Sequence, residues 1–238
     1  MIDFLLNLIF PTACVICDTQ VLERRFGAAC PNCWNTLEPI RLPICPKCGM
    51  PAAAIEDQCR RCRIGENVFD FARSAVSYND TAKELVHRLK YSDRVSLAGP
   101  MAGLLRELLG NFSGNTLVPV PLHRIRERER GFNQAELIAG KLGLRVERNL
   151  LRRRKKTPTQ TGLSRAERRR NLAAAFELQG DVRGKRIIVV DDVLTTGATV
   201  NEISRVLKRG GAERVEVLTF ARVAESVSRR EQPQEPVQ

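Results

Sequence analysis

The segment VVDDVLTTGAT, residues 189–199, decides the fold of this chain. Its first residues end the apolar run GKRIIVV, residues 184–190, which is typical of a central parallel strand buried on both faces. Asp191 and Asp192 follow, and we place them at the carboxyl end of this strand, where open α/β sheets bind ligands. Successive strand residues point to opposite faces, so the two carboxylates need not serve the same purpose.

The residues after the two aspartates are typical of a phosphate-binding loop. Small side chains let the backbone approach an anion, and a helix N-terminus adds partial positive charge. The candidate ligands are Leu194, Thr195, Thr196, Gly197, Ala198 and Thr199. The two carboxylates can hold hydroxyls or a hydrated cation next to this loop. The combination predicts that the ligand is a sugar phosphate. The alternative is a strand-end turn with an ordinary helix cap.

The remainder of the chain after the cysteines alternates strands with helices. The apolar spacing predicts strands at residues 71–78, 116–121, 184–190 and 214–223. It predicts helices at residues 81–91, 96–109, 132–142 and 198–210, the first capped by Asn79 or Asp80. This alternation predicts an α/β domain with a mostly parallel sheet.

All eight cysteines fall in four C-x-x-C pairs near the start of the chain. The pairs are Cys14/Cys17, Cys30/Cys33, Cys45/Cys48 and Cys59/Cys62. Two such pairs complete a Cys₄ zinc site, so we expect two structural zinc ribbons formed by pairs that follow one another in sequence. Three alternatives are interleaved pairing, a single occupied site beside four thiols, and redox activity.

The predicted organisation is a double zinc ribbon over 1–66, an α/β domain over 67–225 and a flexible tail over 226–238. The apolar residues 2–10 are too short to span a bilayer and lack the basic start of a signal peptide. We expect them to pack on the body of the protein, the alternative being a contact with a membrane surface. These features predict a soluble cytoplasmic protein.

Positive charge is concentrated in the middle of the chain. The 238 residues carry a formal net charge of +12, which two zinc–tetrathiolate sites would bring to about +8. Between His123 and Arg170 there are 16 basic and 5 acidic residues, a net charge of +11. This segment predicts a partner rich in phosphate, although a run such as RRRKK at 152–156 is often only solvated.

The opening segment resembles the phosphoribosyl pyrophosphate (PRPP) loop of the type I phosphoribosyltransferases. Two further stretches, PVPLHRIRERERGFNQAELIA at 119–139 and TPTQTGLSRAERRRNLAAAF at 157–176, narrow the resemblance. Together with the four C-x-x-C pairs, they resemble the ComF family over nearly the whole chain. The resemblance implies a double zinc ribbon followed by a type I phosphoribosyltransferase-like domain, PRPP with Mg²⁺ as ligands, and a link to the uptake of transforming DNA.

The resemblance also implies roles for individual residues. Asp191 and Asp192 would engage the ribose hydroxyls at the catalytic position, and the loop 194–199 would bind the 5′-phosphate. The pyrophosphate would meet His123, Arg124, Arg126, Arg128 and Arg130. A loop that closes over the substrate would contain Arg153, Lys155, Lys156, Thr157, Gln160, Arg168 and Asn171. Lys90 and Tyr91 belong to the family pattern without an assigned role.

Two functions fit these features. The first is a phosphoribosyltransferase whose acceptor is unidentified, because we find no nucleobase-recognition motif. The chemistry needs no nucleophilic side chain, since the enzyme stabilises a leaving diphosphate and a cationic ribose. The second is a non-catalytic module that binds PRPP or single-stranded DNA, with a protein of the competence machinery as a further partner.

Overall fold

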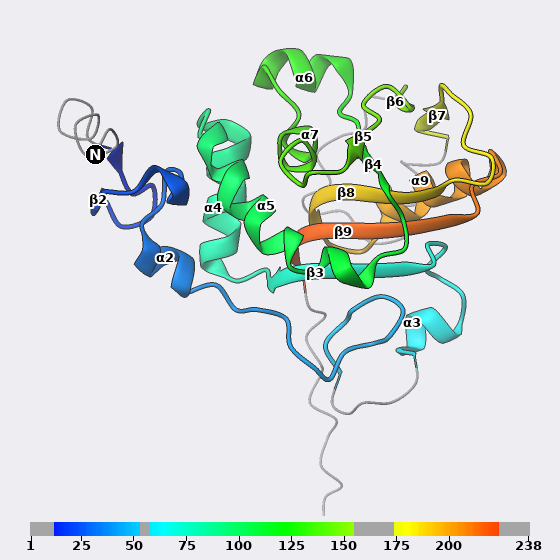
Figure 1. Ribbon diagram of the computed structural model, residues 1–238, viewed down its shortest axis with the longest axis horizontal. Helices are drawn as coiled ribbons and strands as arrows, with labels where there is room; N and C mark the ends of the chain where they lie inside the picture. The colour runs from blue at the N-terminus through cyan, green and yellow to red at the C-terminus, as the bar shows by residue number, and fades with distance from the viewer. Residues whose placement is uncertain (1–11, 53–57, 155–173, 224–238) are drawn as a thin grey trace, which may run out of the picture.

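A five-stranded parallel sheet forms the centre of the molecule (Figure 1). The computed structural model describes residues 12–52, 58–154 and 174–223. The strands, in their order across the sheet, are β3 (Phe71–Ser77), β9 (Arg214–Arg222), β8 (Arg186–Leu194), β4 (Thr116–Pro119) and β5 (Arg145–Val146). All four neighbouring pairs are parallel, which confirms the predicted α/β class.

Strand β8 occupies the middle of the sheet and is buried on both faces. Ile187 and Val189 belong to one apolar core, and Ile188 and Val190 belong to the other. None of the four is exposed, as the continuous apolar run predicted. The predicted end at Val190 was wrong, because β9 continues to pair with β8 as far as Leu194. Both aspartates therefore lie within the strand.

Helices cover the two faces of the sheet (Figure 1). One core contains side chains of α4 (Asp80–Tyr91), α5 (Ala98–Arg106) and α7 (Gln134–Ala139), and the other contains those of α9 (Ala198–Arg209). Asn79 caps α4, because its Oδ1 accepts the N–H of Ala82 at 2.9 Å. The described residues also contain three short 3₁₀ helices, namely η1 (Arg24–Phe26), η2 (Val95–Leu97) and η3 (Leu109–Asn111).

Several elements differ from the sequence-based expectation. The segment expected as a pyrophosphate-binding loop forms helix α6 (Arg124–Arg130), which ends at Gly131 with a φ of 78°. An antiparallel pair, β6 (Leu151–Arg153) and β7 (Phe176–Leu178), lies outside the main sheet. Helix α7 is also shorter than predicted, because Asn133 caps its start and it ends at Gly140.

The two cysteine segments pack onto the α/β domain at separate places (Figure 1). The first contains β1 (Thr12–Ala13), β2 (Gln20–Val21) and α2 (Pro31–Asn35), and it shares an apolar core with α4 and α5. The second contains α3 (Arg60–Arg63) and shares the other core with α9. The predicted N-terminal segment at 2–10 and tail at 226–238 lie outside the described residues. Within the described part of the chain, no helix combines the length and apolar character needed to cross a membrane.

Candidate functional site

A cavity of about 390 Å³ opens at the carboxyl edge of the sheet. Its walls come from β8, the start of α9, the end of α4, helix α6 and strand β6. The polar residues that line it are Lys90, Tyr91, Arg126, Arg130, Gln134, Arg153, Asp191, Asp192, Thr195 and Thr199. Residues from distant parts of the sequence thus meet at the edge where parallel sheets bind ligands.

The two aspartates face opposite sides of the sheet. Asp192 is 3% exposed and forms an ion pair with Lys90 of α4 at 2.6 Å. Asp191 points toward the side of α9 and accepts the backbone N–H of Asp192 at 2.9 Å. Burial and the neighbouring Asp192 carboxylate raise the pKa of Asp191 to about 7. The two carboxylates therefore have different environments, as the alternation along a strand predicted.

Lys90 is the residue whose importance the sequence did not reveal. Burial alone would lower the pKa of Lys90, but the carboxylates of Asp192 and Asp191 outweigh it and raise this pKa above its usual value. Lys90 therefore remains charged. Tyr91 follows Lys90 in the sequence, and its ring centre lies 4.9 Å from the guanidinium of Arg130. The family pattern contained both residues, but only the tertiary structure shows that Lys90 compensates Asp192.

The helix N-terminus at the cavity suits an anion. Helix α9 has 12 residues and begins after Gly197, which adopts a left-handed conformation with φ 75° and provides no side-chain cap. Thr195 and Thr199 line the cavity, and the Thr196 hydroxyl accepts the N–H of Ala198 at 3.4 Å. Leu194 contributes only backbone here, because its side chain is 2% exposed and lies in the core. Helix N–H groups and threonine hydroxyls together form an anion site.

Three arginines form the opposite wall of the cavity. Arg126 and Arg130 are four residues apart on α6, which places them on one helix face. Arg153 of β6 is 8% exposed, and burial together with the nearby Arg126 lowers its pKa. Arg130 donates to Oε1 of Gln134 at 2.6 Å. With Lys90, four cationic side chains face two carboxylates, so the cavity favours an anionic ligand.

Other predicted phosphate ligands lie elsewhere. His123 caps α6, since its Nδ1 accepts the N–H of Ile125 at 3.3 Å. Arg124 lines a separate cavity of about 430 Å³, and Arg128 is exposed. The remaining predicted residues, which are Lys155, Lys156, Thr157, Gln160, Arg168 and Asn171, lie outside the described residues.

The eight cysteines form two separate four-sulfur clusters. The first cluster is Cys14, Cys17, Cys30 and Cys33, and the second cluster is Cys45, Cys48, Cys59 and Cys62. This confirms the predicted pairing in sequence order and overturns the interleaved alternative.

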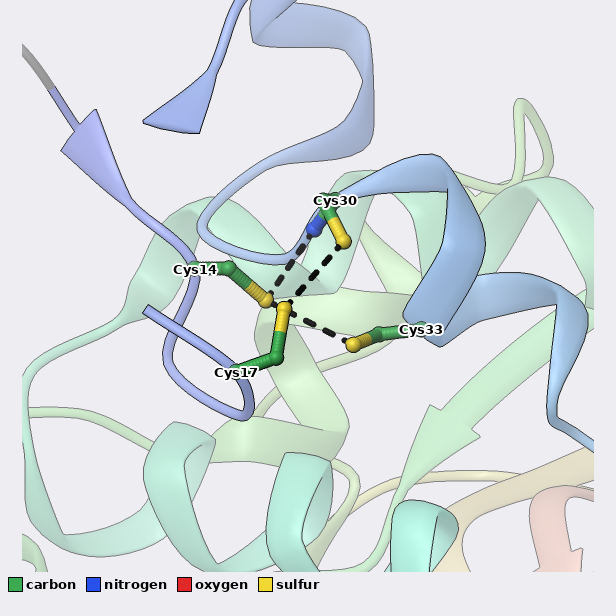
Figure 2. Close-up of side chains that lie close together, drawn as sticks. All are labelled: Cys14, Cys17, Cys30 and Cys33. Carbon is green, nitrogen blue, oxygen red and sulfur yellow. Dashed lines mark hydrogen bonds between the residues drawn. The ribbon is translucent and has the colours of Figure 1, made fainter. Parts of the chain in front are cut away.

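The sulfur geometry of both clusters fits zinc. Figure 2 shows the first cluster, where the Sγ atoms of Cys14 and Cys33 lie 3.7 Å apart and those of Cys17 and Cys30 lie 3.6 Å apart. In the second cluster, the Sγ atoms of Cys48 and Cys59 lie 3.6 Å apart. A tetrahedral ion with Zn–S bonds near 2.3 Å requires sulfur separations of about 3.8 Å. Both clusters are therefore consistent with a zinc site.

Comparison with known proteins agrees with these two parts of the molecule. Residues 5–63 match the double zinc ribbon domain family, and residues 127–237 match the phosphoribosyl transferase domain family. The chain is 35% identical to the DNA utilization protein YhgH of Salmonella typhimurium, over 89% of this chain and 97% of that one. The chain belongs to the ComF family.

Two further relatives carry names that refer to competence. Competence protein F of Haemophilus influenzae is 30% identical over 90% of this chain and 98% of that one. Competence protein ComFC of Bacillus subtilis is 29% identical over 88% of this chain and 94% of that one. This ComF-family chain therefore combines a double zinc ribbon with a phosphoribosyltransferase domain, as its sequence predicted.

Proposed function

We propose that this ComF-family protein binds PRPP together with Mg²⁺ in the cavity at the carboxyl edge of its sheet, and that it acts in the handling of DNA. The observation that carries the proposal is the gathering of two carboxylates, four cations and a helix N-terminus whose N-cap glycine has no side chain, in one cavity of about 390 Å³. The names of its relatives, which refer to DNA utilization and competence, support the second part.

Each group in the cavity has a chemical task in this proposal. The start of α9, with Thr195 and Thr199, binds the 5′-phosphate, and Asp191 accepts hydrogen bonds from the ribose hydroxyls. Lys90 forms an ion pair with Asp192 next to the sugar. Arg126, Arg130 and Arg153 face the diphosphate, whose charge grows as its bond to C1 of the ribose breaks. Mg²⁺, when bound, neutralises diphosphate oxygens, and a carboxylate such as Asp191 suits its preference for oxygen ligands.

The test is titration calorimetry with PRPP and Mg²⁺ on the Asp191→Asn/Asp192→Asn variant. This change keeps the shape of the strand and removes two charged acceptors. Charge-assisted hydrogen bonds contribute roughly 1.5–3 kcal/mol each, so we expect affinity to fall about a hundredfold or more. Zinc content should not change, because the clusters lie in other segments. Arg128→Ala is the control, since Arg128 is exposed and does not line the cavity.

Equal affinity of the double variant and the parent would disprove the assignment of these carboxylates to the sugar. Turnover is a separate question, which we address by measuring pyrophosphate release from PRPP in the presence of nucleobases, amines and DNA ends. Release that depends on one acceptor class, and that is lost in the double variant, identifies an enzyme. Tight binding without release identifies a PRPP-binding module.

A further inference from the structure

The second cysteine cluster lies against the loop that precedes α9. Arg61, which precedes the ligand Cys62 in helix α3, donates a hydrogen bond from Nη2 to the carbonyl oxygen of Thr196. These residues are 135 positions apart in the sequence. Thr196 lies between Thr195 and Thr199, which line the cavity. Arg61 therefore joins the helix that contains Cys62 to the proposed phosphate loop.

A bridge of two asparagines strengthens this contact. Asn67 donates from Nδ2 to Sγ of Cys62 at 3.2 Å and accepts at Oδ1 from Nδ2 of Asn201 at 3.4 Å. Asn201 lies in the first turn of α9, and its Oδ1 accepts the N–H of Val68 at 2.7 Å. The asparagines are only 4% and 6% exposed. A shift of the cluster would leave these buried amides without partners, which is costly.

The strand side of the loop is also in contact with the second cluster. Arg222, at the end of β9, pairs with Leu194 in the sheet. Its Nη1 donates to the carbonyl oxygen of Cys48 at 2.7 Å, and its Nη2 lies 3.7 Å from the Cys48 sulfur. A zinc ion with four thiolates carries a charge of −2, which stabilises a buried guanidinium at this position. The loop is therefore held at both ends by neighbours of the same cluster.

The first cluster occupies a different position. The carbonyl oxygen of Thr36, which follows α2, accepts a hydrogen bond from Nδ2 of Asn79 at 3.0 Å, and its hydroxyl lies 2.8 Å from that of Thr81. These contacts meet the start of α4. Lys90 lies nine residues further along this helix, about 14 Å away at 1.5 Å per residue. These hydrogen bonds of Thr36 therefore support α4 at the end remote from the cavity.

We infer that the metal-loaded second cluster positions the phosphate loop, so that zinc binding at this cluster and phosphate-ester binding in the cavity are energetically linked. Arg61 and Asn67 are the positioning residues. Linkage is reciprocal. A ligand in the cavity must therefore raise the affinity of the second cluster for zinc by the same factor by which zinc in this cluster raises the affinity for the ligand. The inference rests on the proposed function only for the choice of PRPP as the probe.

The first experiment needs no ligand. Cys59→Ser and Cys17→Ser each remove the most exposed cysteine of their own cluster, and each should lower the zinc content of the full chain from about two to about one. We expect hydrogen exchange of the amides in 194–201 to rise at least tenfold in Cys59→Ser and to stay within twofold of the parent in Cys17→Ser. An equal rise in both variants, or no rise in either, would overturn the inference.

The second experiment keeps all eight cysteines and covers the case in which Cys59→Ser fails to fold. In the parent protein, PRPP with Mg²⁺ should slow the transfer of one of the two zinc ions to a chelator by about tenfold, within the usual range of coupling between sites. Asn67→Ala should retain both zinc ions but lose this protection, and it should bind PRPP more weakly than the parent protein does.

The outcomes separate this inference from the proposed function. If PRPP binds the parent but leaves both zinc-transfer rates unchanged, the linkage is disproved and the PRPP site stands. If PRPP does not bind, the proposed function falls, and the loop exchange measured without ligand still decides whether the second cluster positions the loop.

Discussion

Asp191 and Asp192 are adjacent residues that lie in different electrostatic surroundings. Asp192 is buried against Lys90 at 2.6 Å, whereas Asp191 lies on the other face, where burial and Asp192 raise its pKa to about 7. A carboxylate that is half protonated near neutral pH makes ligand binding sensitive to pH. The sequence placed both acids at the site, and strand alternation predicted that they would differ, but the cause of the difference could not be read locally because Lys90 is far away in the chain.

We therefore expect the affinity for PRPP and Mg²⁺ to depend on pH through Asp191. Above pH 7 the carboxylate is ionised and binding is at its strongest. As the pH falls below about 7, a proton must leave before the ligand binds, so affinity should fall by up to about tenfold per pH unit. Calorimetry between pH 5.5 and 8.5 measures this slope.

Asp191→Asn is the control for this prediction, because PRPP itself gains protons in the same range. The variant should bind weakly with a shallower pH dependence than the parent protein. The raised pKa also means that ionisation of Asp191 destabilises the fold as the pH rises toward 7. The penalty builds up from the ordinary pKa of 3.8 to the folded-state pKa of about 7, so the variant should gain more stability relative to the parent at pH 8 than at pH 5. The same gain at both would contradict the assigned pKa.

At the scale of elements, the turn from β8 into α9 sets the geometry of the site. Gly197 adopts φ 75°, and a Cβ there would meet its nearest atom, Nδ2 of Asn201, at an ordinary contact distance of 3.5 Å. The requirement for glycine is thus conformational rather than steric. An L-residue in this region costs about 1–2 kcal/mol.

Gly197→Ala should accordingly lower the free energy of unfolding by about 1–2 kcal/mol and weaken PRPP binding, because the loop would relax away from the left-handed conformation. Gly103→Ala is the matched control. Gly103 lies in helix α5, and a Cβ added there would meet its nearest atom, Nη2 of Arg106, at an ordinary 3.9 Å, so alanine should stabilise the protein by about 0.5–1 kcal/mol. Denaturant unfolding measures both changes, and equal signs would contradict this account.

The predictability of each element from the sequence depended on how local its determinants were. The apolar run of β8 and the Asn79 cap of α4 act over a few residues, and both were predicted. Helix α6 has the sequence RIRERER, and this lack of apolar periodicity hides a helix that is capped by His123 and Gly131. The β6–β7 pair joins segments separated by more than twenty residues, so no local pattern marks it.

At the scale of the whole molecule, helix α6 divides the positive charge between two surfaces. Arg126 and Arg130 face the cavity, whereas Arg124 and Arg128 are exposed on the rest of the helix. The net charge of +11 between His123 and Arg170 exceeds what one sugar phosphate requires. Single-stranded DNA, which the sequence analysis predicted as a partner, remains a proposed second ligand, and exposed arginines suit its phosphates.

We expect single-stranded DNA to bind weakly and with a steep dependence on salt, because phosphate contacts release counterions. Arg124→Ala/Arg128→Ala should weaken this binding and reduce the slope of log K against log salt by about 1.4, which corresponds to two phosphate contacts on a single strand. The same variant should bind PRPP like the parent protein.

The variant Arg126→Ala, on the inner face of the same helix, should have the opposite effect. It should weaken PRPP binding and change the salt dependence of DNA binding little. Fluorescence anisotropy with an oligonucleotide between 50 and 300 mM salt measures the slopes. If the inner and outer variants lose DNA binding equally, the cavity itself holds the strand, and the exposed face of α6 has no part in DNA recognition.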